Sequence, residues 1–282
     1  MLYSVLITGL ILAVLILFYL WTIHPSFRKK EVLKDFARWD YAHRGLWNLA
    51  DEGIPENSLP AFRRAVEHGF AIELDVHLTK DNQLIVFHDD DLKRICSVEG
   101  SCESMSAAQL QSLPLSGTGE YMPLLREVLD LVDGRVPLLI ELKLPTMRTA
   151  ICDHVRELLK NYKGSYLIES FHPLALRRYH KLDPSVPLGQ LSSRYSAKTK
   201  MNPLFKLISS SLTENAVSRP DFIAYNFKHA DALGFALNRR LFHTPAFAWT
   251  ARSPKDYRAC KKSFDAVIFE RFLPDPSSPQ GS

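Results

Sequence analysis

The sequence predicts a (β/α)8 barrel that follows one apolar N-terminal segment. Between residues 39 and 273, eight short apolar stretches alternate with segments whose apolar residues recur at helical spacing. Eight strands separated by helices are more typical of a closed parallel barrel than of a doubly wound sheet. Several stretches also end in polar or charged side chains, and barrel enzymes place their catalytic groups at the C-terminal ends of strands.

The N-terminal segment, residues 1–24, is predicted to be a transmembrane anchor. Its first 23 residues carry no charged side chain, and a helix of that length reaches about 34 Å, which exceeds a hydrocarbon core of roughly 30 Å. Tyr3, Tyr19 and Trp21 suit the two membrane interfaces. A cleaved signal peptide would need a basic start and a small-residue cleavage site, and neither is evident. We therefore expect a single-pass membrane protein in contact with the lipid bilayer.

Residues 25–38 read as a basic juxtamembrane linker. The basic side chains of this segment are Arg28, Lys29, Lys30, Lys34 and Arg38. No basic side chain precedes the apolar segment, so the positive-inside rule predicts a cytoplasmic catalytic domain. Cys96 and Cys102 could close a short disulfide loop, but we favour free thiols in that reducing compartment.

The barrel is predicted over residues 39–273, with an unstructured tail at 274–282. The predicted strands are 39–43, 70–76, 137–143, 166–170, 187–191, 222–226, 245–250 and 266–270. The first helix is expected to begin at the N-cap Ser58 and to end at Gly69.

One further strand, residues 84–89, follows the second barrel strand too closely for a parallel crossover, so it must return as a β-hairpin insertion. A two-residue turn at 81–82 would pair Asp75 with His88. The period of two would then place Glu73 on the same face as both. Two carboxylates and an imidazole on one face could hold a divalent cation and transfer a proton.

Polar groups also close three other predicted strands. His43 and Arg44 end the first strand, Glu141 and Lys143 end the third, and Trp249 lies near the end of the seventh. An apolar run that acquires two opposite charges at its end is poor core unless those charges are paired or liganded. We therefore expect these side chains to meet at the mouth of the barrel.

Four ordered motifs resemble those of the glycerophosphodiester phosphodiesterase family, which belongs to the barrel phosphodiesterases that include phosphatidylinositol-specific phospholipase C. The motifs are AHRG at 42–45, PENS at 55–58, ELDVHLTKDNQLIVFHD at 73–89 and ELK at 141–143. Weaker similarities are ESFHP at 169–173 and AWTARS at 248–253. The resemblance extends over about residues 39–272.

The resemblance implies a metal site and a pair of catalytic histidines. It implies that Glu73, Asp75 and Glu141 bind one divalent ion, and three carboxylates suit Mg²⁺ or Ca²⁺. It also implies that His43 and His88 are the general acid and base. Imidazole titrates close enough to neutral pH for both tasks.

The resemblance further implies contacts to the phosphate and the rest of the substrate. Arg44 and Lys143 would hold phosphate oxygens. Glu56 and Asn57 would either bind the metal or orient its ligands. Trp249 is expected to touch the substrate.

The chain departs from the family pattern near the predicted mouth. Arg252 stands where many members have Asn, and Glu270 and Arg271 stand where many have Thr and Asp. These positions put the head-group specificity in doubt and leave the hydrolytic residues intact.

We therefore expect a membrane-anchored, metal-dependent hydrolase that cleaves glycerophosphodiesters to an alcohol and sn-glycerol 3-phosphate, with a glycerophosphodiester or a lysophospholipid as its substrate partner. The alternatives are a phospholipase C- or D-type cleavage of intact or lyso-phospholipid at the membrane and a membrane-tethered binding protein without turnover. A composition of 46% apolar and 23% charged residues is that of an ordinary folded protein. The net charge of +4 comes from dispersed basic residues, which argues against nucleic acid as a partner.

Overall fold

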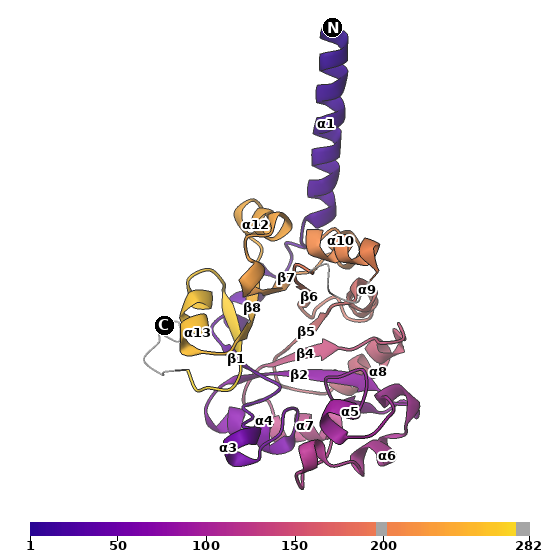
Figure 1. Ribbon diagram of the computed structural model, residues 1–282, viewed down its shortest axis with the longest axis vertical. Helices are drawn as coiled ribbons and strands as arrows, with labels where there is room; N and C mark the ends of the chain where they lie inside the picture. The colour runs from indigo at the N-terminus through magenta and orange to yellow at the C-terminus, as the bar shows by residue number, and fades with distance from the viewer. Residues whose placement is uncertain (196–201, 275–282) are drawn as a thin grey trace.

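The computed structural model describes residues 1–195 and 202–274, and it shows a barrel from which one long helix projects (Figure 1). The predicted tail at 274–282 therefore lies outside the described residues, except for its first position. The barrel strands are β1 (Asp40–His43), β2 (Ala71–Leu78), β4 (Leu138–Leu142), β5 (Tyr166–Ser170), β6 (Leu188–Ser192), β7 (Phe222–Asn226), β8 (Ala246–Ala251) and β9 (Ala266–Phe269). All eight pair in parallel with their neighbours, and β1 closes the barrel by pairing with both β2 and β9. The predicted fold class is confirmed.

Helices surround the barrel, cover one of its ends and form part of a lobe inserted after β3. They are α2 (Lys30–Phe36), α3 (Leu49–Glu52), α4 (Leu59–Glu67), α5 (Lys93–Cys96), α6 (Ala107–Gln111), α7 (Leu125–Val132), α8 (Ala150–Leu159), α9 (Pro173–Leu182), α10 (Pro203–Ser211), α11 (Asn215–Ser218), α12 (Leu233–Arg240) and α13 (Pro254–Lys261). Helix α4 begins as predicted, because the Ser58 hydroxyl accepts a hydrogen bond from the Ala61 amide. Gly69, just after this helix, takes the left-handed conformation with a φ of 71°.

The predicted linker is partly folded. Leu33 and Phe36 of α2 are buried in a cluster with apolar residues of the barrel strands, including Tyr41 and Phe247. The Tyr41 hydroxyl donates a hydrogen bond to the Phe36 carbonyl at 3.0 Å. Helix α2 thus covers the end of the barrel opposite the predicted mouth. The apolar residues of the segment explain why it packs against the barrel. The basic residues, on which the prediction of a linker rested, did not indicate this packing.

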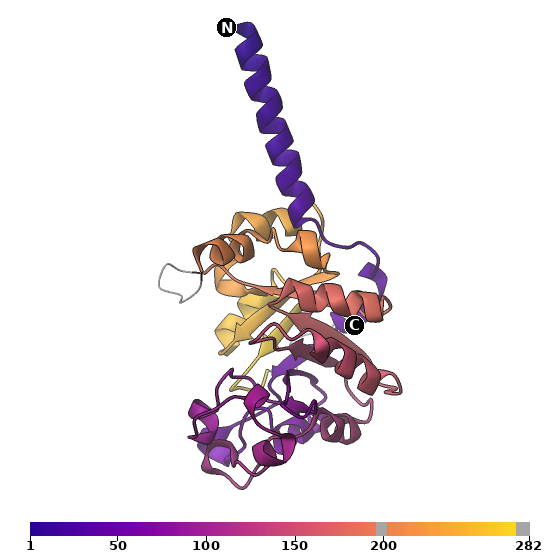
Figure 2. The same ribbon diagram turned by 90° about the vertical axis from the view of Figure 1, so that its right-hand side faces the viewer.

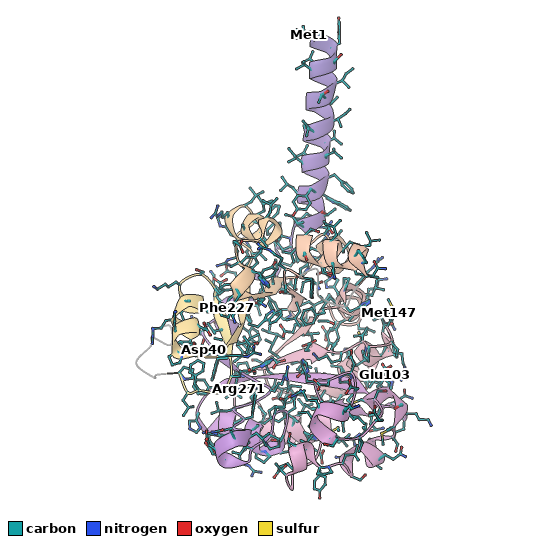
Figure 3. The ribbon with its side chains drawn as sticks, in the orientation of Figure 1. Met1, Asp40, Glu103, Met147, Phe227 and Arg271 are labelled. Carbon is teal, nitrogen blue, oxygen red and sulfur yellow. The ribbon has the colours of Figure 1, made fainter. Side chains whose placement is uncertain are left out.

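Helix α1 (Leu2–Ile23) projects away from the barrel (Figure 2). Its side chains point outward on all sides (Figure 3). Its length and apolar composition suit a membrane span, although a signal sequence has the same properties. Its last turn is bonded to the barrel: Asn215 Nδ2 donates to the Ile23 carbonyl at 2.9 Å, and Tyr19 Oη donates to the Ser211 carbonyl at 3.1 Å.

The hairpin insertion is present as β3 (Leu84–Val86), but its predicted register is wrong. Val76 pairs with Val86 and Leu78 with Leu84, so Phe87 lies opposite Asp75 and donates its amide to the Asp75 carbonyl at 3.0 Å. The turn has three central residues instead of two, because Asn82 adopts the left-handed conformation with a φ of 59°. Three-residue hairpin loops commonly end in such a residue.

The chain between β3 and α7 folds back as a small lobe with its own apolar cluster. Ile85, Leu92, Leu110 and other apolar residues form this cluster. Cys96 and Cys102 belong to it as buried free thiols. Both side chains pack within this apolar cluster, as the prediction of free thiols expects.

Candidate active site

The predicted site residues gather at the C-terminal ends of β1, β2 and β4. A pocket of about 150 Å³ lies at this end of the barrel. Its lining includes His43, Arg44, Glu73, His88, Glu141, Glu169, Trp249, Thr250 and Arg252. His88 reaches the pocket because β3 ends at Val86, so the alternation of the strand no longer directs its side chain. The two histidines therefore line one pocket despite the incorrect register prediction.

Strand register explains why four acidic side chains meet here. Glu73 pairs with His43 of β1, and Asp75 pairs with Glu141 of β4. Glu141 in turn pairs with Glu169 of β5. Asp75, Glu141 and Glu169 thus lie side by side on three neighbouring strands, and Glu73 lies two residues before Asp75 on the same face of β2. We call this buried group of four carboxyl groups the acidic layer.

The turn after β1 depends on a glycine. Arg44 and Gly45 have φ values of 58° and 79°. A Cβ at Gly45 would lie 2.9 Å from the backbone carbon of Ala61 in α4, so only glycine fits. This turn directs the Arg44 amide to Glu73 Oε2 at 2.9 Å. The HRG sequence thus fixes the position of a predicted metal ligand.

The predicted metal ligands are crowded. Glu73, Asp75 and Glu141 each offer an oxygen atom, and these atoms all lie within 4.8 Å of one another. Burial and the neighbouring carboxylates raise the pKa of Glu73 well above its usual range. Mutual repulsion of this kind is relieved by a divalent cation, and an all-oxygen donor set suits a hard ion. The residues present therefore fit Mg²⁺ or Ca²⁺.

Lys143 lies within the acidic layer. Its ammonium group is 2.9 Å from Asp75 Oδ1 and 2.8 Å from Glu141 Oε1. Burial would lower the pKa of Lys143, but the two carboxylates raise it, so the side chain stays charged. Asp75 differs from Glu73, because Lys143 and Arg44 hold the pKa of Asp75 well below its usual range despite its burial.

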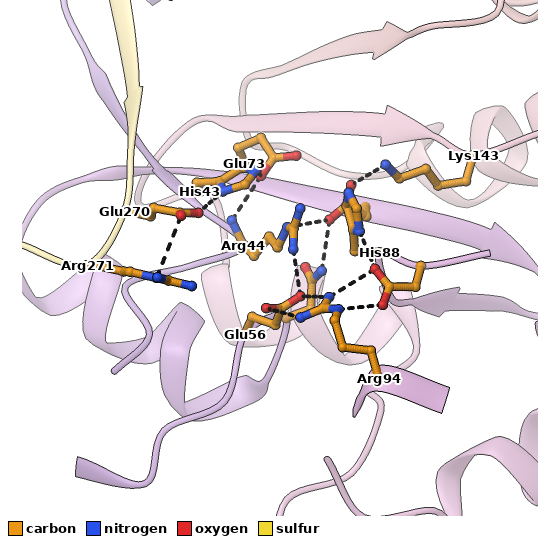
Figure 4. Close-up of polar contacts among 12 residues, drawn as sticks. His43, Arg44, Glu56, Glu73, His88, Arg94, Lys143, Glu270 and Arg271 are labelled. Carbon is orange, nitrogen blue, oxygen red and sulfur yellow. Dashed lines mark hydrogen bonds and ion pairs between the residues drawn. The ribbon is translucent and has the colours of Figure 1, made fainter. Parts of the chain in front are cut away.

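His43 is oriented by a carboxylate that comes from the other end of the chain. Its Nδ1 atom donates to Glu270 Oε2 at 2.5 Å (Figure 4). Arg252 Nε lies 2.6 Å from Glu270 Oε1. Burial alone would raise the pKa of Glu270, but His43 and Arg252 lower it to about 2. An ionised acceptor on Nδ1 keeps a proton there and leaves Nε2 as the basic nitrogen.

His88 has the same arrangement. Its Nδ1 atom donates to Asp89 Oδ1 at 2.6 Å, and Arg94 binds the same carboxylate, with Nε 2.6 Å from Asp89 Oδ2. Hydrogen bonds from His88 and Arg94 outweigh burial and lower the pKa of Asp89. Both histidines therefore present Nε2 as the atom that exchanges a proton.

Glu56 connects Arg44, a predicted phosphate contact, to Arg94, which binds the carboxylate partner of His88. It accepts from Arg44 Nη1 at 2.7 Å and from Arg94 Nη2 at 2.7 Å (Figure 4). Its carboxylate is thus occupied by two guanidinium groups. This geometry favours a role in positioning Arg44 over direct metal binding.

Asn57 contacts a predicted metal ligand directly. Its Nδ2 atom donates to Asp75 Oδ2 at 2.9 Å, and its backbone has a φ of 54°. The side chain is buried, and its Oδ1 atom has no hydrogen-bond partner among the residues that the structure describes. Asn57 is therefore placed to orient Asp75.

Trp249 forms an aromatic wall of the pocket together with Phe171. The two rings meet edge to face with centroids 5.8 Å apart. Both residues line the pocket, as the prediction of a substrate contact for Trp249 requires.

Four residues of the site were not assigned a role from the sequence. They are Asp89, Arg94, Glu169 and Glu270. Asp89, Glu169 and Glu270 each lie at or next to the end of a predicted strand, so the rule that polar strand ends are functional could have found them. Arg94 had no such signal, because its contacts join segments far apart in the chain.

Comparison with known proteins agrees with this geometry. The model of the glycerophosphoryl diester phosphodiesterase family matches residues 43–273. The Bacillus subtilis protein YhdW is 31% identical over 229 residues, which cover 76% of this chain and 86% of that protein.

Human lysophospholipase D GDPD1 is 31% identical over 157 residues, covering 51% of this chain and 48% of that protein. An Oleispira antarctica phosphodiesterase, solved in complex with the product sn-glycerol-3-phosphate, shares the fold with a TM-score of 0.67 and 22% identity. The matched region covers 83% of this chain and 94% of the Oleispira antarctica chain. The chain thus belongs to the glycerophosphoryl diester phosphodiesterase family, whose members are phosphoric diester hydrolases.

Proposed function

We propose that this protein is a membrane-anchored, metal-dependent enzyme that hydrolyses glycerophosphodiesters to an alcohol and sn-glycerol 3-phosphate. The observation that carries the proposal is the pair of histidines in one pocket, each with Nδ1 bound to a carboxylate, beside a crowded acidic triad. The product bound to the Oleispira antarctica relative supports the same substrate class.

A divalent ion held by the acidic triad, together with two cationic side chains, would offset the negative charge of the phosphodiester. Mg²⁺ or Ca²⁺ held by Glu73, Asp75 and Glu141 would supply positive charge for the phosphate oxygens. Arg44, held by Glu56, and Lys143, held in the acidic layer, add two fixed cations. An anionic diester repels an attacking oxygen until its charge is offset, so this arrangement favours the transition state.

His43 and His88 would move the protons. One accepts a proton from the attacking oxygen at Nε2, and the other donates one from Nε2 to the leaving alcohol. The carboxylates on Nδ1 fix each ring and stabilise it when it is charged. Trp249 and Phe171 would contact the organic part of the substrate.

The anchor is part of this proposal. Cleavage of α1 would remove a helix end that is bonded to the barrel through Ile23, Trp21 and Tyr19. Those contacts support a retained helix that holds the barrel close to a bilayer, with the basic linker on the cytoplasmic side. A C-terminal fluorescent-protein fusion and a C-terminal alkaline phosphatase fusion test the orientation. Fluorescence without phosphatase activity supports a cytoplasmic barrel, and the reverse contradicts it.

The activity itself is tested with the full chain, glycerophosphocholine and either Mg²⁺ or Ca²⁺. Replacing His43 or His88 by Ala should lower kcat by roughly 10²- to 10⁴-fold, which is the usual contribution of general acid-base catalysis. His68→Ala is the matched control, because His68 is exposed and remote from the site. Wild-type rates in both active-site variants would overturn the assignment. Release of phosphocholine would indicate a phospholipase C reaction, and binding without turnover would indicate a binding protein.

A further inference from the structure

A second, larger hollow adjoins the catalytic pocket. It has a volume of about 1080 Å³, against about 150 Å³ for the polar pocket. His88, Glu141 and Phe171 line both of them, so the two spaces lie against each other. A phosphoglycerol group needs only the polar pocket, and the larger groove is in the size range that accommodates a whole organic ligand.

The groove is apolar beyond the shared end. Its walls include Leu144, Met147, Leu174, Phe205, Ile208 and Val217. Its one buried carboxyl group away from the catalytic end is Glu214, and burial raises the pKa of Glu214 to about 8, so this wall is largely uncharged at neutral pH. The other charged residues of the lining are Asp89, Asp90, Asp91, Glu141 and Lys143, which belong to the catalytic end or directly follow His88 in the chain. Among the described residues, the rest of the lining is therefore without fixed charge.

Several of these side chains lack a covering partner. Phe205 is 57% exposed, Met147 54% and Leu174 40%. Large apolar side chains that cluster on a surface mark a site of interaction with a ligand or membrane.

The outer wall of the groove also holds the anchor. Helix α10 carries Phe205 and Ile208 on the groove side, and the carbonyl of its last residue, Ser211, accepts from Tyr19 of α1. Leu204 and Leu207, on the same helix but outside the groove, are 63% and 67% exposed. Figures 1 and 2 both show α10 beside the root of α1. A bilayer that surrounds α1 would therefore lie next to this helix.

We propose that the groove binds the single acyl chain of a lysophospholipid, which enters from the bilayer beside α10 while its phosphodiester reaches the catalytic pocket. This inference rests on the proposed function and names the substrate class. An acyl chain fits because the occupant must be apolar and must be joined to a phosphodiester at the catalytic end. The anchor keeps the opening at a surface where such lipids reside.

The first test is a substrate series for the full chain in nanodiscs of non-hydrolysable diether lipid. The substrates are glycerophosphocholine and lysophosphatidylcholines with 6, 8 and 10 acyl carbons, all below their micelle concentrations. We expect kcat/KM to rise roughly two- to fourfold for each added methylene, since burying one is worth about 0.8 kcal/mol. Hydrolysis of glycerophosphocholine with no dependence on chain length would overturn the groove assignment and leave the proposed function intact.

Two variants one residue apart make the test specific. Phe205→Asp places a charge in the groove, and Leu204→Asp places one at a similarly exposed site outside it. Phe205→Asp should flatten the chain-length series and still cleave glycerophosphocholine. Leu204→Asp should keep the wild-type series. An equal slope in Phe205→Asp and wild type would contradict the proposal.

A binding measurement decides the matter independently of turnover. A lysophosphatidylcholine with a photoreactive diazirine on its acyl chain is crosslinked to the His88→Ala protein in the same nanodiscs. Crosslinks at Phe205, Val217 or Leu174 are expected. Crosslinks confined to α1 or to the outer side of α10 would overturn the acyl-chain site, even if glycerophosphocholine is not a substrate.

Discussion

Glu270 offers the sharpest test of how the site prepares His43. Replacing it by Gln keeps the size of the side chain but removes the charge that both His43 Nδ1 and Arg252 Nε contact, at 2.5 and 2.6 Å. The amide can also donate to Nδ1, which would move the imidazole proton to Nε2. A hydrogen bond to a charged group contributes about 1.5–3 kcal/mol. We therefore expect kcat for glycerophosphocholine to fall roughly 10- to 150-fold.

The assay separates positioning from a general structural effect. KM should change by less than about threefold, since Glu270 would act through His43 and not on the bound phosphate. Glu270→Asp, which keeps the charge, should recover part of kcat. Arg271→Ala is the control, because Arg271 is exposed and its Nε atom lies 3.7 Å from Glu270 Oε1, so this contact contributes little. An unchanged kcat in Glu270→Gln would refute the reasoning, and so would equal losses in the Gln and Asp variants.

Three further perturbations follow from the structure. Gly45→Ala should lower the free energy of unfolding by about 2–4 kcal/mol in urea titration, because the left-handed φ and the contact with Ala61 both oppose a Cβ; unchanged stability would contradict the steric argument. Glu214→Gln should become more stable than wild type as pH rises from 5 to 8, by up to a few kcal/mol. The sign follows because the raised pKa of about 8 costs the wild type stability once the unfolded carboxyl ionises; parallel unfolding curves at both pH values would contradict it. Mg²⁺ or Ca²⁺ at 100 times its Kd should raise the free energy of unfolding by about 2.7 kcal/mol in wild type and much less in Asp75→Asn, and an equal rise in both would argue against the acidic triad as the metal site.

The strand pattern and the polar strand ends predicted the barrel and most of its mouth. Parallel strands align their C-terminal ends, so side chains such as His43 and Glu141 meet whatever the length of chain between them. The hairpin register was not predictable from turn length alone, because the choice between two and three turn residues depended on Asn82 adopting a positive φ. That choice is stabilised by local hydrogen bonds, including one from the Gln83 amide to the Thr79 hydroxyl.

Contacts between distant segments could not be predicted either. Glu270 reaches His43 across 227 positions of sequence because β9 closes the barrel against β1. Its identity as Glu looked like a departure that affects specificity, whereas the structure places it on a predicted catalytic histidine. Similarly, Arg94 joins Asp89 to Glu56 only because the lobe after β3 folds back towards the segment that precedes α4.

The most direct test of the central claim is ³¹P NMR of glycerophosphocholine incubated with the full chain and Mg²⁺ or Ca²⁺. We predict conversion to sn-glycerol 3-phosphate, abolished by chelation and lowered at least 100-fold in His88→Ala, in line with general acid-base catalysis. Phosphocholine as the phosphorus-containing product, or hydrolysis that persists without a divalent ion, would contradict the account.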